Sequence, residues 1–194
     1  MRNTFAILSG ILSLIAYAPY AYAMIKSNGV VRPNRAGWFV WWLVDATMLW
    51  ALYSAHAYSA MPMFVGFTLG STVILLLSLK GGDMKFTKLD ASCVAVALIG
   101  IVVWRMFSID YPVVSVVANV SSLMMGTIPT IFKSLRNPES EDLLTWMVFA
   151  AGGMFGVLAI PALTFVDVLP AVSTLLIQLG IIASIFIGKK RAVV

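Results

Sequence analysis

Residues 19–38 read PYAYAMIKSNGVVRPNRAGW, and residues 129–146 read PTIFKSLRNPESEDLLTW. Each stretch begins with a proline inside an apolar segment and continues through a Lys-Ser pair into a loop rich in Arg, Pro and Asn. Each then reaches a tryptophan near the start of the next apolar segment. This shared order of features indicates that the chain contains two related units.

The spacing of matching residues extends the relationship beyond these two stretches. Trp38 and Trp146 are 108 residues apart, and Pro62 and Pro170 are separated by the same 108 residues. Weak internal symmetry of this kind is how structural repeats of membrane transporters show in a sequence. The sequence therefore predicts an internal repeat that covers at least two apolar segments and the loops beside them.

The composition places the chain in a membrane. Of its 194 residues, 61% are hydrophobic and 11% are charged, whereas a soluble domain carries about 25% charged residues. A membrane-spanning helix needs about 20 residues, so seven spans leave little beyond short connections and no soluble catalytic domain. The seven expected spans are Thr4–Ile25, Gly37–Ala55, Met61–Leu79, Ala91–Ile109, Tyr111–Phe132, Leu143–Leu163 and Val168–Gly188.

The repeat and the spans together predict an all-α membrane protein in a 3+1+3 arrangement. Residues 1–79 form the first three-helix repeat, and residues 80–110 contain a cytoplasmic loop and linker helix four. Residues 111–194 form the second repeat and a basic tail. Because one linker helix separates two sets of three, both repeats enter the membrane from the same side and are parallel.

The basic residues predict the orientation of the chain. All Lys and Arg residues except Arg2 and Arg105 fall on one side when the spans alternate in direction. Short loops with excess Lys and Arg stay in the cytoplasm. We therefore expect an outside N-terminus and a cytoplasmic C-terminus in the cytoplasmic (inner) membrane of a bacterium. The positive net charge then reflects topology, and no nucleic-acid partner is expected.

The pattern resembles the SWEET/SemiSWEET and PQ-loop transporter superfamily, whose members have the same 3+1+3 architecture and orientation. The local similarity is sharpest in residues 129–134, PTIFKS, which match the Pro-Gln or Pro-Thr motif and the basic-serine stretch that follows it. The first repeat departs from that motif with Pro19-Tyr20. The third and seventh spans lack the Trp and Asn of sugar-transporting members, so the resemblance implies the fold and transport but no sugar specificity.

Asp45 is the ionisable residue nearest the centre of a span. A central Asp costs about 2.5–3.5 kcal/mol to insert, so such residues usually face a polar cavity and mark a functional site. Trp41 and Trp42 lie near its helical face, and an acid beside aromatic rings suits a small polar or cationic solute. Proton exchange at Asp45 is the expected coupling step. The structural alternative is that Asp45 only hydrogen-bonds a neighbouring helix.

Asn119 and Gln178 lie near the middle of the fifth and seventh spans. With Asp45 they could form a polar layer at the membrane midplane, where transporters of this type bind substrate. Polar side chains also join transmembrane helices through hydrogen bonds worth about 0.6 kcal/mol each. For these two residues substrate binding and helix association stay equally open.

Pro19 and Pro129 occupy matching places near the ends of the first and fifth spans. A proline inside a helix removes one backbone hydrogen bond and favours a kink, so we expect both to act as hinge or gate residues. Tryptophans near span ends, among them Trp38 and Trp146, are interpreted first as anchors at the membrane interface.

These features favour a secondary transporter or facilitator that moves a small polar solute by alternating access. A receptor or sensor that does not transport is the alternative, because fold alone does not fix function. We expect no enzyme activity, since intramembrane proteolysis needs paired acids or a Ser/His pair that the spans do not offer. No cofactor and no metal are expected, because His56 is the single histidine and has no cysteine partner. The expected partners are a small-molecule solute and the lipid bilayer, and the chain could also form homo-oligomers.

Overall fold

The computed structural model describes residues 1–26, 31–33, 35–81, 87–107 and 112–192. All regular structure in these residues is helical. In chain order the elements are α1 (Arg2–Ile15), α2 (Tyr17–Lys26), α3 (Arg35–Ser54), α4 (Met61–Gly81), α5 (Lys88–Phe107), α6 (Pro112–Arg136), the short 3₁₀ helix η1 (Pro138–Ser140), α7 (Leu143–Leu158) and α8 (Phe165–Ala192). The middle of the first basic loop and the expected junction of the fourth and fifth spans lie outside the described residues.

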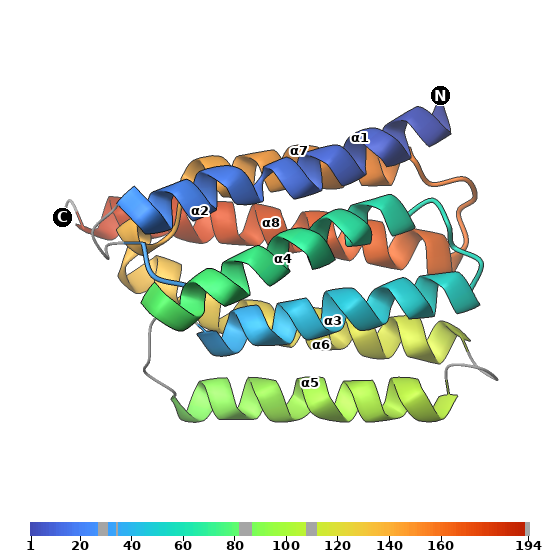
Figure 1. The fold of residues 1–194 in the computed structure, drawn as a ribbon, viewed down its shortest axis with the longest axis horizontal. Helices are drawn as coiled ribbons and strands as arrows, with labels where there is room; N and C mark the ends of the chain where they lie inside the picture. Colours follow the sequence, from blue (N-terminus) through green and yellow to red (C-terminus); the bar gives the residue numbers. More distant parts are fainter. Residues whose placement is uncertain (27–30, 34, 82–86, 108–111, 193–194) are drawn as a thin grey trace.

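The helices lie side by side along the long axis of the molecule, and successive long helices run in opposite directions (Figure 1). The first residues of α1 and the last turns of α8 therefore lie at opposite ends. The ends of α2, α6 and α8 carry Lys26, Lys133 and Lys189. We call this end of the bundle the basic end.

Six helical segments form a ring, and α5 packs outside it. In the first half of the chain α4 lies between α1–α2 and α3, and in the second half α8 lies between α6 and α7. The two halves meet where α1 contacts α7 and where α3 contacts α6. Helix α5 contacts α6 and α3. The same order of contacts therefore recurs in both halves.

Four helical segments in the described part of the chain are long and apolar enough to cross a membrane. They are Arg2–Lys26, Met61–Leu79, Val113–Arg136 and Phe165–Arg191. This finding is compatible with an integral membrane protein. Helix α7 has only 16 residues, and membrane spans at α3, α5 and α7 stay predictions.

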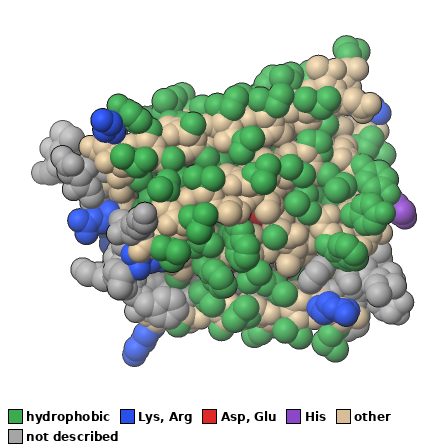
Figure 2. All heavy atoms as spheres, viewed as in Figure 1, with side chains coloured by type: hydrophobic (Ala, Val, Ile, Leu, Met, Phe, Trp, Pro, Cys, Tyr) green, Lys and Arg blue, Asp and Glu red, His purple; other side chains and the backbone are tan. Residues whose placement is uncertain are grey.

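The bundle has an apolar surface along its length, and its largely apolar interior also holds several polar side chains. Large apolar side chains cover the visible long face, whereas most visible Lys and Arg side chains lie at its ends (Figure 2). Inside, Ser9, Ser13, Asp45, Asn119 and Gln178 are buried. Apolar residues facing outward and polar residues facing other helices are typical of helices that pack together in lipid.

The helix boundaries differ from the expected spans at several places, and two of these lie on either side of the connection between α7 and α8. Helix α7 ends at Leu158 rather than at Leu163. Helix α8 begins at Phe165, because the Thr164 hydroxyl caps it by accepting a hydrogen bond from the Asp167 N–H at 3.2 Å, while donating to the Asp167 carboxylate at 2.6 Å. This reciprocal capping starts the helix three residues earlier than the apolar pattern indicated.

The two predicted hinge prolines sit in different local structures. The first span is divided into α1 and α2 at Ala16, three residues before Pro19, which fits the loss of the hydrogen bond that a proline N–H would donate one turn back. Pro129 lies within α6, which continues without a break to Arg136. Movement at either proline stays a prediction.

Glycines let the helices of the first half approach closely. A Cβ added at Gly66 of α4 would lie 2.5 Å from the backbone oxygen of Gly10 in α1. A Cβ at Gly70 would lie 1.9 Å from the ring of Tyr17. Gly66 therefore lets α4 pack closely against α1, and Gly70 leaves the space that the Tyr17 ring occupies.

Candidate functional site

An internal cavity lies between the two halves of the ring. It reaches the mid-length of α3 and α8 and extends toward the basic end, where α7 begins. The cavity leaves about 50 Å³ for the centres of water molecules, and one water needs roughly 10–15 Å³ on that scale. Several waters or a small solute therefore fit. The lining residues are Tyr17, Trp38, Trp41, Asp45, Phe67, Leu123, Trp146, Phe149, Thr174, Ile177 and Gln178.

Asp45 brings a carboxylate to this cavity from the middle of α3. Its side chain is only 3% exposed. The polar groups beside it are the Ser71 hydroxyl of α4 and the Tyr17 phenol. Among the described residues no Lys, Arg or His forms an ion pair with it. A buried carboxylate without a cationic partner attracts a proton or a bound cation.

Five aromatic side chains around the cavity touch one another in a closed cycle, which we call the aromatic collar. Its members are Tyr17, Trp38, Trp41, Trp146 and Phe149. The centroids of successive rings are 4.8–5.9 Å apart, and most of the contacts are edge-on. This geometry favours aromatic pairs and fixes the orientation of each ring. Phe67 packs on the collar at 5.8 Å from Phe149.

Two polar atoms of the cavity lining have no protein partner. The side-chain oxygen of Gln178 and the indole N–H of Trp41 are buried and make no hydrogen bond. Buried polar groups normally have partners, because an unpaired one costs about 1–3 kcal/mol. Both residues line the cavity, while the Gln178 oxygen lies beside Gly153 of α7 and the Trp41 nitrogen lies beside Gly126 of α6. An unused acceptor and an unused donor on lining residues are compatible with waters or a polar ligand.

The second half of the chain makes room for Gln178 with a glycine. A Cβ at Gly153 would lie 2.5 Å from the Gln178 side-chain oxygen. At the repeat spacing, Gly153 is the counterpart of Asp45, and Gly70 is the counterpart of Gln178. Each half thus offers one polar side chain and one glycine, from opposite members of its helix pair. The cavity is therefore chemically asymmetric.

Asn119 and Trp42 do not line this cavity. The Asn119 side chain accepts a hydrogen bond from Thr47 at 2.6 Å and donates one to the Ser115 carbonyl at 2.9 Å, which ties α6 to α3. The Trp42 indole donates to the Thr72 hydroxyl at 3.0 Å and so joins α3 to α4. Of the predicted binding residues, the structure brings Asp45, Trp41 and Gln178 together at one cavity.

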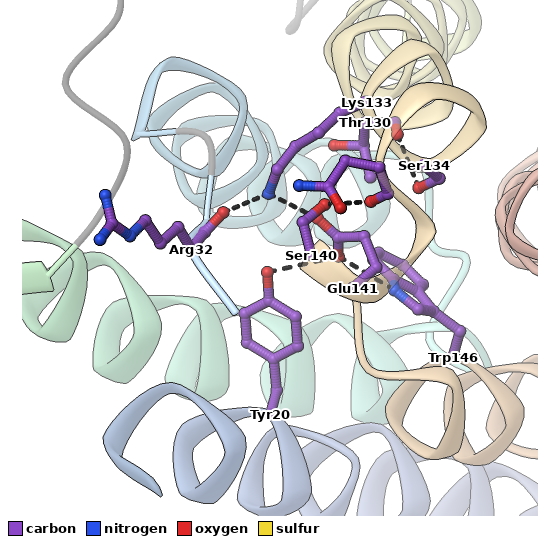
Figure 3. Close-up of polar contacts among 9 residues, drawn as sticks. Tyr20, Arg32, Thr130, Lys133, Ser134, Ser140, Glu141 and Trp146 are labelled. Atoms are coloured by element: carbon purple, nitrogen blue, oxygen red, sulfur yellow. Dashed lines mark hydrogen bonds and ion pairs between the residues drawn. The ribbon is translucent and has the colours of Figure 1, made fainter. Parts of the chain in front are cut away.

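A second buried carboxylate, Glu141, lies at the basic end between η1 and α7 (Figure 3). It accepts hydrogen bonds from Lys133 at 3.0 Å, from Tyr20 at 3.3 Å and from Trp146 at 3.2 Å. Lys133 also donates to the backbone oxygen of Arg32. The cluster therefore connects α2 and the first basic loop with α6 and α7, and we call it the Glu141 cluster.

The Glu141 cluster shares side chains with the collar. Trp146 lines the cavity with its ring and donates its indole N–H to Glu141. Tyr20 donates to Glu141 and packs against Trp38, with ring centroids 5.2 Å apart. Trp38 and Trp146 thus separate the cavity from the Glu141 cluster at the basic end.

Some of these residues carry roles that the sequence did not reveal. As tryptophans near span ends, Trp38 and Trp146 are expected first at the membrane interface, and that interpretation is wrong, because each is only 3% exposed within the bundle. The sequence also places Trp38 near the helical face of Asp45, and both residues line the cavity. Their matching places in the repeat were the signal in the sequence that could have indicated a shared role.

In the described residues, no group of His, Cys, Asp and Glu could hold a metal ion.

Comparisons of the chain with models of known protein families, with curated proteins and with solved structures found no significant match.

Proposed function

We propose that this protein is a secondary transporter or facilitator of a small polar solute. The observation that carries the proposal is the cavity between the halves, where Asp45 has no cationic partner among the described residues and Gln178 and Trp41 each leave a hydrogen-bonding atom free. A buried acid within a membrane-spanning bundle usually marks a functional site. The lining offers no pair of catalytic acids, and we propose no enzyme activity.

The packing of the helices supports alternating access between two parallel repeats in a 3+1+3 arrangement. In each half the third helix lies between the other two, and the halves meet through equivalent contacts, α1 with α7 and α3 with α6. Such halves can rock about a site that both of them line. The third helix of each half, α4 or α8, then moves together with the other two helices of that half. Pro19 and Pro129 are the proposed hinges.

We further propose that the basic end faces the cytoplasm and that the Glu141 cluster closes the pathway there. Two of its hydrogen bonds cross between the halves: Tyr20 donates to Glu141, and Lys133 donates to the backbone oxygen of Arg32. Opening that end requires these contacts to separate. Proton exchange at Asp45 would couple transport to the proton gradient, since it is the one charged residue that lines the cavity in the described part of the chain.

The test uses the full-length protein reconstituted in liposomes. A thermal-shift panel of sugars, amino acids, vitamins and amines selects solutes that bind, and radiolabelled counterflow then measures exchange. We expect at least one binder to show saturable counterflow above that of empty liposomes. Saturable binding without counterflow of any binder would contradict transport and support a receptor.

A further inference from the structure

We propose that the cavity binds a small alkylammonium ion, which is an organic cation whose nitrogen carries apolar groups. This inference rests on the proposed function, because it names the class of solute that the same site would take. It follows from three properties of the lining: one carboxylate, a collar of aromatic rings and two unused hydrogen-bonding atoms.

The charge of the site selects a cation. Asp45 is the one acidic residue among the lining residues, and no described basic residue pairs with it. An ionised Asp45 therefore leaves a net negative charge in a buried space, which a cation would neutralise. An anion, or a zwitterion whose carboxylate approaches Asp45, would meet repulsion instead.

The collar selects apolar groups around that charge. Tyr17, Trp38, Trp41, Trp146 and Phe149 present aromatic surface around the space next to Asp45. Aromatic rings attract cations, and Trp does so most strongly, while the same rings pack against methyl groups. A bare inorganic cation would instead need several oxygen ligands, and the described lining has one carboxylate. Since the rings are held in place by one another, little reorganisation is needed on binding.

The two unused atoms select a polar substituent. The Gln178 side-chain oxygen can accept a hydrogen bond, and the Trp41 indole N–H can donate one. A hydroxyl group on the ligand can serve as donor or acceptor to these atoms. The remaining space is small, so the cation should have few heavy atoms beyond its alkylated nitrogen and hydroxyl. Choline has these features and is a suitable probe.

The experiment measures binding to the purified full-length protein by isothermal titration. The probes are choline, its uncharged isostere 3,3-dimethyl-1-butanol, and glycine betaine, in which a carboxylate replaces the hydroxymethyl group of choline. We expect saturable choline binding, with the isostere and betaine each at least about tenfold weaker. Equal binding of choline and the isostere, or no choline binding, would overturn the proposal.

Two variants locate the site. Asp45→Asn should weaken choline binding at least about tenfold, and Phe149→Leu should weaken it roughly threefold to thirtyfold because a collar ring is lost. Phe155→Leu is the matched control, because Phe155 lies on the same helix but packs against Phe5 away from the cavity. It should bind as the wild type does. If a variant does not fold, the comparison of the three probes on the wild-type protein still tests the proposal.

The outcomes separate this inference from the proposed function. Selective choline binding without counterflow would contradict transport and leave the ligand class standing. Counterflow of an uncharged solute by a protein that does not bind choline would overturn the ligand class and leave transport standing.

Discussion

Two buried carboxylates of this bundle, Glu141 and Asp45, differ in the partners that surround them. Glu141 at the basic end is 7% exposed and accepts hydrogen bonds from Lys133, Tyr20 and Trp146. Asp45 at the cavity is 3% exposed, and among the described residues no ion pair includes it. One acid therefore has a cationic partner, whereas the other has only neutral polar neighbours among the described residues.

The difference separates a structural role from a binding role. A buried acid with a cationic partner and two further donors holds helices together, and its loss destabilises the fold. A buried acid beside unused polar atoms retains capacity for a proton or a ligand. Because Trp146 contacts both the cavity and Glu141, a ligand that moves this ring would also disturb the cluster at the basic end.

The largest effect on stability is expected at Lys133. Lys133→Met leaves Glu141 buried without its cation, which should lower the unfolding free energy by about 3 kcal/mol. This value is near the lower end for a buried pair, because the Lys133 side chain is 18% exposed. Unfolding in mild detergent by a denaturant titration would measure it.

Two further variants check the cause of that effect. The double variant Lys133→Met/Glu141→Met removes both charges and should be more stable than Lys133→Met alone. The control is Lys189→Met, whose ion pair with Glu139 spans 3.5 Å and is exposed. That change should alter stability by less than about 1 kcal/mol. Equal losses of unfolding free energy in Lys133→Met and Lys189→Met would show that the buried ion pair stabilises the fold no more than the exposed one does.

The next largest effect on stability is expected at Gly70, which packs against Tyr17. Gly70→Ala places a Cβ against the Tyr17 ring, which is held by Trp38 and Phe149 and cannot shift freely. We expect a loss of about 2 kcal/mol in unfolding free energy, as for an overpacked core. Gly180→Ala is the control, because the nearest atom to its Cβ would be 4.0 Å away. The same denaturant titration should find that control at least as stable as the wild type.

A smaller effect is expected from one donor to Glu141. Tyr20→Phe removes a hydrogen bond of 3.3 Å and leaves the ring packing in place, so the loss should be about 1 kcal/mol. Tyr22→Phe changes an exposed tyrosine on the same helix and should leave the melting temperature unchanged. If the two variants melted alike, the Tyr20 hydroxyl would contribute nothing to the cluster.

The sequence predicted what depends on local pattern. The positions of the helices followed from apolar runs, and Asp45 and Gln178 were identified as polar groups at mid-span before the cavity was known. Trp41 was predicted to be a binding residue because it lies near the helical face of Asp45. The start of α8 differs from the prediction, because capping by Thr164 decides the boundary within a largely apolar region.

Contacts between distant residues were not predictable from one sequence. Tyr20 and Glu141 are 121 positions apart, so nothing in the local pattern of either indicates the other. Glu141 was one of three acids at the start of a helix, where acids are common, and Asp142 is the one that caps α7. The collar likewise unites rings from both halves, and only the packing of α2, α3 and α7 brings them together.

The most direct measurement compares Asp45→Asn with Glu141→Gln in the same liposomes, recording counterflow of a bound solute and, in detergent, unfolding free energy. Asp45→Asn should lose counterflow at least about tenfold while its stability changes by less than about 1 kcal/mol, because Asp45 forms no ion pair with any residue that the structure describes. Glu141→Gln should lose roughly 1.5–3 kcal/mol of stability, since it removes the charge that Lys133 contacts. Wild-type counterflow by Asp45→Asn would contradict the assignment of the cavity as the transport site.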